Sequence, residues 1–204
     1  MLLNLQFSYK HKKYLVLIFF MSIDFRKLLA DSSIKLADIA ASVIFEEPER
    51  IENLTRVILA DEDPFSSRAA RAFAVCTEKL PELFEKQQHA IIPYLKHIKS
   101  EGVIRNILKI AADYPVKLTK KNNGIMLGLC FDWLEDLSKP VAIRVHAMQI
   151  IYNISLHEAG IRDELISILE ENYANGTIGF RSRADRILKN LYRQNNEFYR
   201  KEKG

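Results

Sequence analysis

An arginine recurs in this 204-residue chain at nearly constant intervals, each time near the start of an apolar-periodic segment. Arg68, Arg105, Arg144 and Arg181 are separated by 37, 39 and 37 residues. The segments around them read "DPFSSRAARAFAV", "SEGVIRNILKIAA", "KPVAIRVHAMQII" and "GTIGFRSRADRIL". Apolar residues follow each arginine at helical spacing, so we expect each segment to form a helix with one buried side. A period of this length is typical of arrays in which one supersecondary unit repeats along the chain.

Helical periodicity extends beyond these four segments, and no stretch has the alternating pattern that predicts a strand. Proline, glycine and asparagine break the pattern and divide it into helix pairs. We expect one or two helices at 24–45, and single helices at 49–60, 64–79, 82–98, 101–114, 123–137, 140–156, 159–174 and 178–198. Pro93 should interrupt its helix, and Pro115 should end the helix before it. The sequences "NNG" at 122–124 and "NG" at 175–176 predict turns.

Composition favours one helical domain and excludes several other classes of protein. Hydrophobic residues make up 48% of the chain, which is enough for a core in a domain of this length. Seven glycines and six prolines leave little room for long loops or a glycine-rich phosphate-binding loop. The two cysteines, Cys76 and Cys130, stand far apart in apolar helical contexts, as in a reduced protein. We therefore expect a cytoplasmic location.

The first twenty residues do not fit the helical pattern. Basic residues precede an apolar run from Tyr14 to Met21, which is the order found in a signal peptide. The run is too short to span a bilayer, and no small-residue cleavage site follows it. Met21 is our preferred initiator. The alternatives are a membrane or export signal, and a structured extra segment or tag-like tail. We expect no association with a membrane.

The repeated pattern resembles that of HEAT repeats, a family of the α-solenoid class. The similarity lies in the proline or polar residue four positions before each arginine and the small or apolar residues after it. It covers about 49–194 and is weakest in the second unit, where Arg105 lies beside Lys109 and Asp113 on a polar side. The resemblance implies an all-α fold, a short right-handed α-solenoid of about four helix pairs. Within it, 1–20 would be an extension outside the core, 21–48 an N-terminal helical cap, and 49–200 the repeats.

The resemblance also implies a scaffold role for the repeated arginine, which in HEAT repeats commonly pairs with an acid near the end of the unit's first helix. Asp136 is our first choice as partner for Arg144, because a buried, unpaired guanidinium would cost several kcal/mol. Asp61 or Asp63 is the expected partner of Arg68. The residues to which we assign a structural role are Arg68, Arg144, Arg181 and Asp136.

The side of these helices that faces away from the repeated arginine carries the sharpest functional hypothesis. In the third unit His146, Gln149 and Asn153 share one polar side. Shifting these positions by the repeat length selects a ridge along the concave face, apolar at its N-terminal end and polar and basic at its C-terminal end. The predicted partner-binding residues are Phe73, Ile107, Ile110, Tyr114, His146, Gln149, Asn153, Arg183, Arg186 and Asn190. The alternative is that Phe73, Ile107 and Ile110 are covered by the N-terminal helices or packed in a tightly curved array.

Signatures of catalysis are missing from the sequence. It has no GxSxG, HExxH, P-loop or GxGxxG pattern, and its five histidines form no i, i+4 ligand pair. We therefore expect no catalytic, cofactor-binding or metal site, and no enzyme activity. Trp133 and Asp136 resemble the neighbouring tryptophan and aspartate of HEAT-like alkylpurine DNA glycosylases. The aromatic and basic residues that would line a nucleic-acid groove do not accompany them.

Basic residues are concentrated near the C-terminus, where 177–204 contain eight Lys or Arg and three Asp or Glu. Such a segment suits an acidic partner or phosphates. We predict a non-enzymatic protein-binding scaffold or adaptor that uses its concave face, with another protein or peptide, one with an acidic segment, as its partner. The alternative is a nucleic-acid-binding protein related to HEAT-like DNA alkylation repair proteins.

Overall fold

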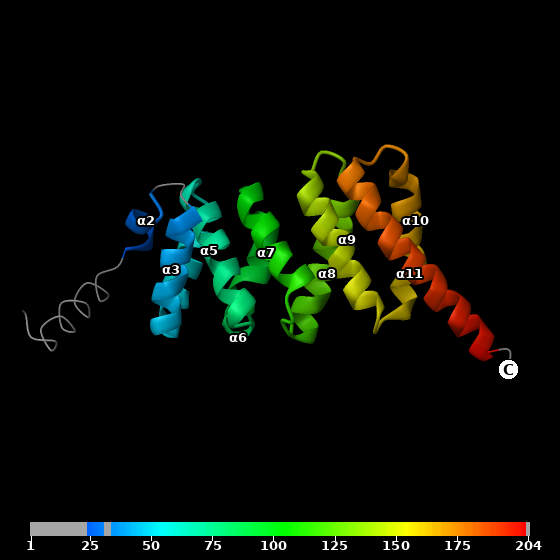
Figure 1. Cartoon of the computed structure of the whole chain (residues 1–204), viewed down its shortest axis with the longest axis horizontal. Helices are drawn as coiled ribbons and strands as arrows, with labels where there is room; N and C mark the ends of the chain where they lie inside the picture. Colours follow the sequence, from blue (N-terminus) through cyan, green and yellow to red (C-terminus); the bar gives the residue numbers. More distant parts are fainter. Residues whose placement is uncertain (1–23, 31–33, 203–204) are drawn as a thin grey trace, which may run out of the picture.

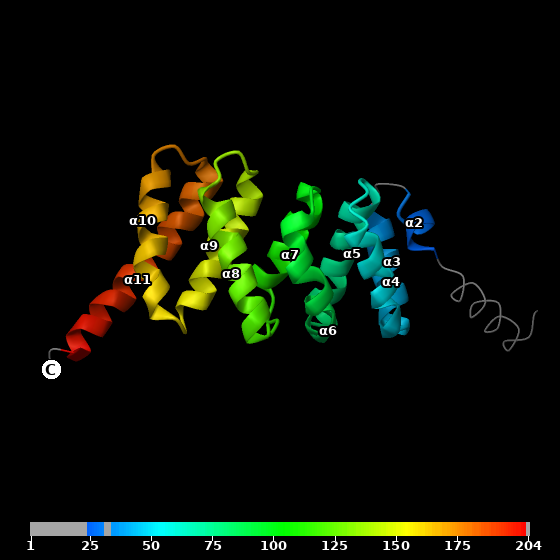
Figure 2. The ribbon, with the colours of Figure 1, turned by 180° about the vertical axis from the view of Figure 1, so that it is seen from behind.

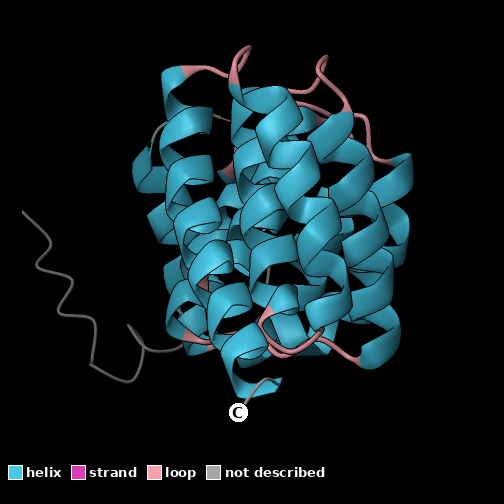
Figure 3. Cartoon of the chain, turned by 90° about the vertical axis from the view of Figure 1, so that its right-hand side faces the viewer, coloured by secondary structure: helices cyan, strands magenta, loops and turns pink. Residues whose placement is uncertain are grey.

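The computed structural model describes residues 24–30 and 34–202, so the predictions made for 1–20 and for Met21 lie outside the described residues. The described part of the chain consists of helices and short connections, without a strand (Figure 3). The α-helices are α2 (Phe25–Leu28), α3 (Ile34–Glu46), α4 (Ile51–Leu59), α5 (Phe65–Lys79), α6 (Glu82–Ile91), α7 (Glu101–Asp113), α8 (Lys120–Glu135), α9 (Val141–Ser155), α10 (Arg162–Tyr173) and α11 (Ile178–Glu202). Short 3-10 helices are η1 (Pro48–Arg50), η2 (Ile92–His97) and η3 (Ala159–Ile161). The prediction of an all-α fold is confirmed.

The helices form two layers that run the length of the molecule (Figures 1 and 2). Helices α3, α5, α7, α9 and α11 lie side by side in one layer, which we call the inner layer, each packed on the next. Helices α4, α6, α8 and α10 form the outer layer behind them. Each outer helix precedes an inner helix in the chain, so the molecule is a short α-solenoid of stacked helix pairs. Helix α3, in the segment expected to be a cap, packs along α5 and begins the inner layer.

The core fills the space between the layers and between neighbouring units. Fully buried alanines of α5, among them Ala69 and Ala72, let adjacent helices approach closely. One close approach is at Gly102 of α7, where a Cβ atom would lie 2.6 Å from the Cβ of Ser67 on α5. A side chain at this position would therefore force the two inner helices apart.

Most of the predicted helix boundaries agree with the structure. Helix α6 ends at Ile91, and Pro93 stands in the 3-10 helix that follows, so the expected interruption is confirmed. Helix α7 ends at Asp113, before the Tyr114–Pro115 bond. The turn at 175–176 is also present.

The turn predicted at 122–124 is wrong, because α8 already begins at Lys120. The hydroxyl of Thr119 accepts a hydrogen bond from the backbone N–H of Asn122 at 3.3 Å and caps the helix. The side chain of Asn122 donates to Oε1 of Gln88 on α6 at 3.0 Å. These contacts override the local turn preference of "NNG", and one of them joins residues that are 34 positions apart in the chain.

Both cysteines are buried and free. Burial raises the pKa of the Cys76 thiol to about 12 and raises that of Cys130 further from its usual range. Two buried, protonated thiols are poor nucleophiles and poor metal ligands. In the described part of the chain, no helix is both long and apolar enough to cross a membrane.

Candidate partner-binding face

Arg144 is buried where four helices meet, with 7% of its surface exposed. Its Nε donates to the carbonyl of Leu134 near the end of α8 at 3.0 Å, and its Nη2 donates to Oδ1 of Asn172 on α10 at 2.9 Å. The guanidinium lies over the ring of Phe180 on α11, 4.7 Å from the centroid. Burial lowers the pKa of Arg144, and the negative charge of Asp136 partly opposes this effect. Arg144 thus joins its own helix, α9, to α8, α10 and α11.

The expected ion pair between Arg144 and Asp136 is replaced by these hydrogen bonds. The carboxylate of Asp136 accepts from the backbone N–H and the hydroxyl of Ser138, at 2.9 and 2.6 Å, and closes the turn after α8. The same two hydrogen bonds lower the pKa of Asp136. A helix-end carbonyl can take the place of the acid because it carries partial negative charge and has no partner within its own helix.

Arg68 binds backbone carbonyls in the same way. Its Nη1 donates to the carbonyls of Leu29 and Ala30, just after α2, at 2.9 and 2.6 Å. The pairing predicted with Asp61 or Asp63 is therefore wrong. Asp61 accepts the two backbone N–H groups that precede α7, at 2.8 and 3.0 Å, and Asp63 accepts from the first turn of α5 at 3.2 Å.

Arg105 departs from this pattern because α7 begins one residue earlier relative to its arginine. Helix α7 starts at Glu101, four residues before Arg105, whereas the other three inner helices start three residues before theirs. One residue is 100° of rotation on a helix. Ile104 therefore takes the buried position, and Arg105 is exposed. Arg181 is half-buried, and its positive charge acts on Tyr173 at the end of α10.

The apolar members of the predicted binding ridge are core residues. Phe73, Ile107 and Ile110 have no exposed surface, so the prediction that they contact a partner is wrong. Phe73 packs edge-on against Phe84, with ring centroids 6.1 Å apart and planes at 71°. For Ile107 and Ile110 the cause is again the one-residue shift of α7. They were chosen by moving from His146 and Gln149 by a constant repeat length, and in α7 this leads to buried positions.

With this shift included, two exposed residues of α7 align with two half-buried polar residues of α9. Lys109 then corresponds to Gln149, and Asp113 corresponds to Asn153. Asn153 donates from Nδ2 to the carbonyl of Ala112, beside Asp113, at 2.9 Å. We call the resulting surface the inner face and define it by Arg71, Val75, Glu78, Arg105, Lys109, Asp113, His146, Gln149, Asn153 and Arg183.

Hydrogen bonds hold the polar part of the inner face in place. Gln149 donates from Nε2 to Oδ1 of Asn153 at 2.8 Å. The guanidinium of Arg183 on α11 donates to Oε1 of Gln149 at 2.7 Å. Together with the bond from Asn153 to α7, these contacts join three consecutive inner helices across the predicted polar residues.

His146 lies half-buried beside this network, and its Nδ1 is buried without a hydrogen-bond partner. Burial lowers the pKa of its imidazole. The positive charges of Arg183, Lys109 and Arg105 lower it further, and the carboxylate of Asp113 opposes them. The charges that act on His146 therefore come from the helices on both sides of α9.

A hollow of about 300 Å³ opens on the inner face between α5 and α7. Tyr114 forms one wall, with Nζ of Lys109 5.7 Å from its ring centroid and its hydroxyl 3.3 Å from Oε2 of Glu78. The lining residues are Arg71, Ala74, Val75, Glu78, Arg105, Asn106, Lys109 and Tyr114. Of these only Tyr114 was predicted, although the polar side of 101–114, with its arginine and lysine one turn apart, was a signal in the sequence.

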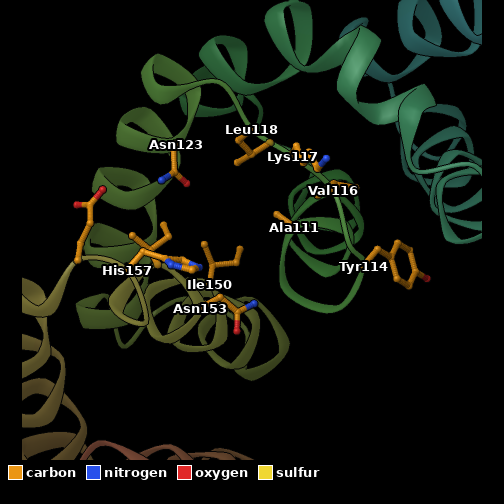
Figure 4. A pocket seen from close by; sticks show the side chains of 11 residues that line it. Ala111, Tyr114, Val116, Lys117, Leu118, Asn123, Ile150, Asn153 and His157 are labelled. Atoms are coloured by element: carbon orange, nitrogen blue, oxygen red, sulfur yellow. The ribbon is translucent and has the colours of Figure 1, made fainter. Parts of the chain in front are cut away.

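A second hollow, of about 340 Å³, lies past the end of α7, between the 114–119 connection, α8 and the last turns of α9 (Figure 4). The predicted residues Tyr114 and Asn153 belong to its wall. Its surface combines aliphatic residues such as Leu118 and Ile150 with polar ones such as Asn123 and His157 (Figure 4).

The last two predicted residues lie on α11. Arg186 is exposed and lines a shallow hollow with Tyr173 and Lys189 at the C-terminal end of the array. Asn190 is half-buried one turn further along. Among the described residues, no group of three or more His, Cys, Asp or Glu side chains is placed to hold a metal ion.

Stacked helix pairs with one continuous inner layer define an α-solenoid. The family model of the HEAT repeat domain matches residues 25–191, which is most of the chain. The protein therefore belongs to the HEAT repeat family, and the match includes the segment that was expected to be a separate cap. Neither the curated proteins nor the solved structures gave a significant match. HEAT repeats generally serve as scaffolds for interactions between proteins.

Proposed function

We propose that this protein is a non-enzymatic scaffold or adaptor that binds another protein along its inner face. The observation that supports this most is the continuity of that face across α5, α7, α9 and α11, which pack one against the next. Hydrogen bonds from Asn153 to α7 and from Arg183 to Gln149 hold its side chains in place before a partner arrives. A surface ordered in advance loses less conformational entropy on binding. The buried, free cysteines are consistent with a cytoplasmic location, which we also propose.

Nucleic-acid binding is the second candidate, and the cations of the inner face are the observation that favours it. Two features count against it. Glu78 and Asp113 stand among those cations and would repel a continuous row of phosphates. Trp133, which with Asp136 resembled a glycosylase pair, is 8% exposed and packs in the core.

The proposal is tested by blocking the inner face without changing its charge. Gln149→Trp places a bulky side chain on the inner face, and Gln87→Trp makes the same change at a half-buried glutamine of outer helix α6. The full chain and both variants are used for affinity purification from the source cell, followed by mass spectrometry, after circular dichroism has shown that each is folded. We expect one or more co-purifying proteins to be lost with Gln149→Trp and kept with Gln87→Trp. An identical set of proteins in all three purifications would reject the inner face as the binding surface.

A further inference from the structure

We propose that the inner face recognises an acidic peptide segment, and that a glutamate or aspartate of this segment is anchored in the hollow between α5 and α7 by Arg71, Arg105 and Lys109. This inference rests on the proposed protein-binding function and specifies the chemistry of the partner. It concerns residues of α5 and α7 that the repeat pattern alone did not select.

The three cations of the hollow are not neutralised by the protein itself. None of the three forms an ion pair with a described residue. Among the described residues, the ion pairs join Arg26 to Glu62 and Arg50 to Glu47, and neither lies at the hollow. Glu78 is the one carboxylate among the lining residues, and it accepts a hydrogen bond from the hydroxyl of Tyr114. The hollow therefore has an excess of positive charge, which favours a bound anion.

The lining of the hollow suits the side chain of an acidic residue better than a small inorganic anion. Ala74, Val75 and the ring of Tyr114 supply apolar wall beside the charged groups. These surfaces can pack against the methylene groups of a glutamate while its carboxylate binds the two guanidinium groups. Arginine binds carboxylates through paired N–H donors, which makes such contacts directional as well as strong.

The distribution of charge favours a peptide over a nucleic acid. Duplex DNA carries one negative charge for about every 1.7 Å of its axis, so a strand crossing this face would bring phosphates close to Glu78 and Asp113. A peptide, in contrast, can carry acidic residues at the positions that face cations and neutral residues at the positions that face Glu78 and Asp113. Single-stranded nucleic acid also needs exposed rings for stacking, whereas the ring of Tyr114 already has Lys109 close to it.

The same segment can continue from the hollow toward α9 and α11. Arg105 and Lys109 line the hollow and lie on α7, which packs on α5 on one side and on α9 on the other. There Arg183 adds a further cation, and it donates a hydrogen bond to Gln149. A segment with acidic residues at its start and polar or acidic residues after them fits this order of groups.

The test measures binding of a fluorescein-labelled oligoglutamate peptide to the full chain by fluorescence anisotropy at low ionic strength. Arg105→Glu and Lys109→Glu reverse charges at the hollow. Arg56→Glu on α4 and Lys86→Glu on α6 make the same changes at exposed positions of the outer layer. We expect the inner-face variants to bind the peptide about tenfold more weakly or worse, because each loses a charge-assisted contact. The outer-layer variants should bind it like the unmodified chain.

A labelled oligolysine peptide and a single-stranded thymidine oligonucleotide serve as comparison probes. Absence of oligoglutamate binding, or equal weakening by inner and outer reversals, would overturn the inference. Tighter binding of the oligonucleotide with the same dependence on Arg105 and Lys109 would overturn it in favour of nucleic acid. Either result is separable from a failure of the proposed function, because loss of co-purifying proteins with the uncharged change Gln149→Trp does not depend on these cations.

Discussion

At Arg144 the chain buries a cation against a backbone carbonyl, an amide oxygen and an aromatic ring. Arg68 likewise donates to two carbonyls at the end of a helix in the preceding unit. The last carbonyls of a helix lack partners within it, and an arginine with several N–H donors satisfies them across a unit boundary. The repeated arginine therefore belongs to the scaffold at these two positions, through the backbone of neighbouring helices and not through an ion pair.

Replacing Arg144 by methionine should destabilise the protein by about 2 kcal/mol. The change keeps an apolar side chain of similar length but leaves the Leu134 carbonyl and Asn172 Oδ1 without their donor in a buried place. Arg105→Met is the matched control, and because Arg105 is exposed it should change stability by less than about 0.5 kcal/mol. Urea unfolding followed by circular dichroism compares the two. Equal losses would mean that the contacts of Arg144 contribute no more than those of a surface arginine.

His146 should make the stability of the fold depend on pH. Its folded-state pKa is lowered, so the unfolded chain takes up the proton first as the pH falls. The stabilisation is complete above the unfolded pKa of about 6.5 and is lost as the pH falls toward the lower folded pKa. Urea midpoints at about pH 7.5 and about pH 5.5 should therefore differ more for the unmodified chain than for His146→Gln. The carboxylates titrate alike in both proteins. If the urea midpoints at the two pH values differ as much in His146→Gln as in the unmodified chain, His146 is not a source of the pH dependence.

Among the elements, the connection between α7 and α8 is held by side chains of α6, chiefly the buried Gln88, with Glu85 accepting from the backbone N–H of Lys117 at 2.9 Å. Gln88 of α6 donates to the carbonyl of Lys117 at 3.1 Å and accepts from the backbone N–H of Thr119 at 2.8 Å. Its Oε1 also accepts from the side chain of Asn122, in the first turn of α8. This explains why the helix begins before the "NNG" sequence, which in isolation predicts a turn.

Gln88→Leu should cost about 2–4 kcal/mol of stability, because it leaves the buried side chain of Asn122 and two part-buried backbone groups of this connection without their partner. Gln87→Leu, at the neighbouring half-buried position, should cost less than about 1 kcal/mol. Chemical unfolding gives both values. If the two variants lose the same stability, the connection is held by other contacts.

Helix α7 shows how one residue decides the face that an element presents. Its N-terminus is set by Ser100, whose hydroxyl accepts from the N–H of Val103 at 3.3 Å. That capping serine is visible in the sequence, and the predicted helix start at 101 agrees with the structure. The rotation of the helix relative to its neighbours is set by contacts such as the close approach of Gly102 to Ser67.

At the scale of the whole molecule, each inner helix packs on the inner helices beside it, and α5, α9 and α11 also pack on the outer helices of their own units. Such an array is stabilised locally, unit by unit, and its faces extend as far as the units do. The inner face therefore brings residues of four helices, more than a hundred positions apart in the chain, onto one surface. A long rigid surface of this kind suits an extended segment of another protein, which is the function we propose.

The sequence by itself determined the helical class, most helix boundaries, the period of the units and the family. These follow from local signals: apolar residues at helical spacing, and prolines such as Pro93 and Pro115 that end or interrupt helices. It also identified His146, Gln149 and Asn153 as one polar group, since they share a side of a single helix.

Only the tertiary structure decided which residues of different helices meet at the surface. Phe73, Ile107 and Ile110 were assigned to the binding face by a constant repeat length, and packing placed all three in the core. The hollow formed by α5 and α7 was missed for the same reason. A shift of one residue turns a helix by 100°, and that rotation is fixed by contacts between helices, which no local pattern records.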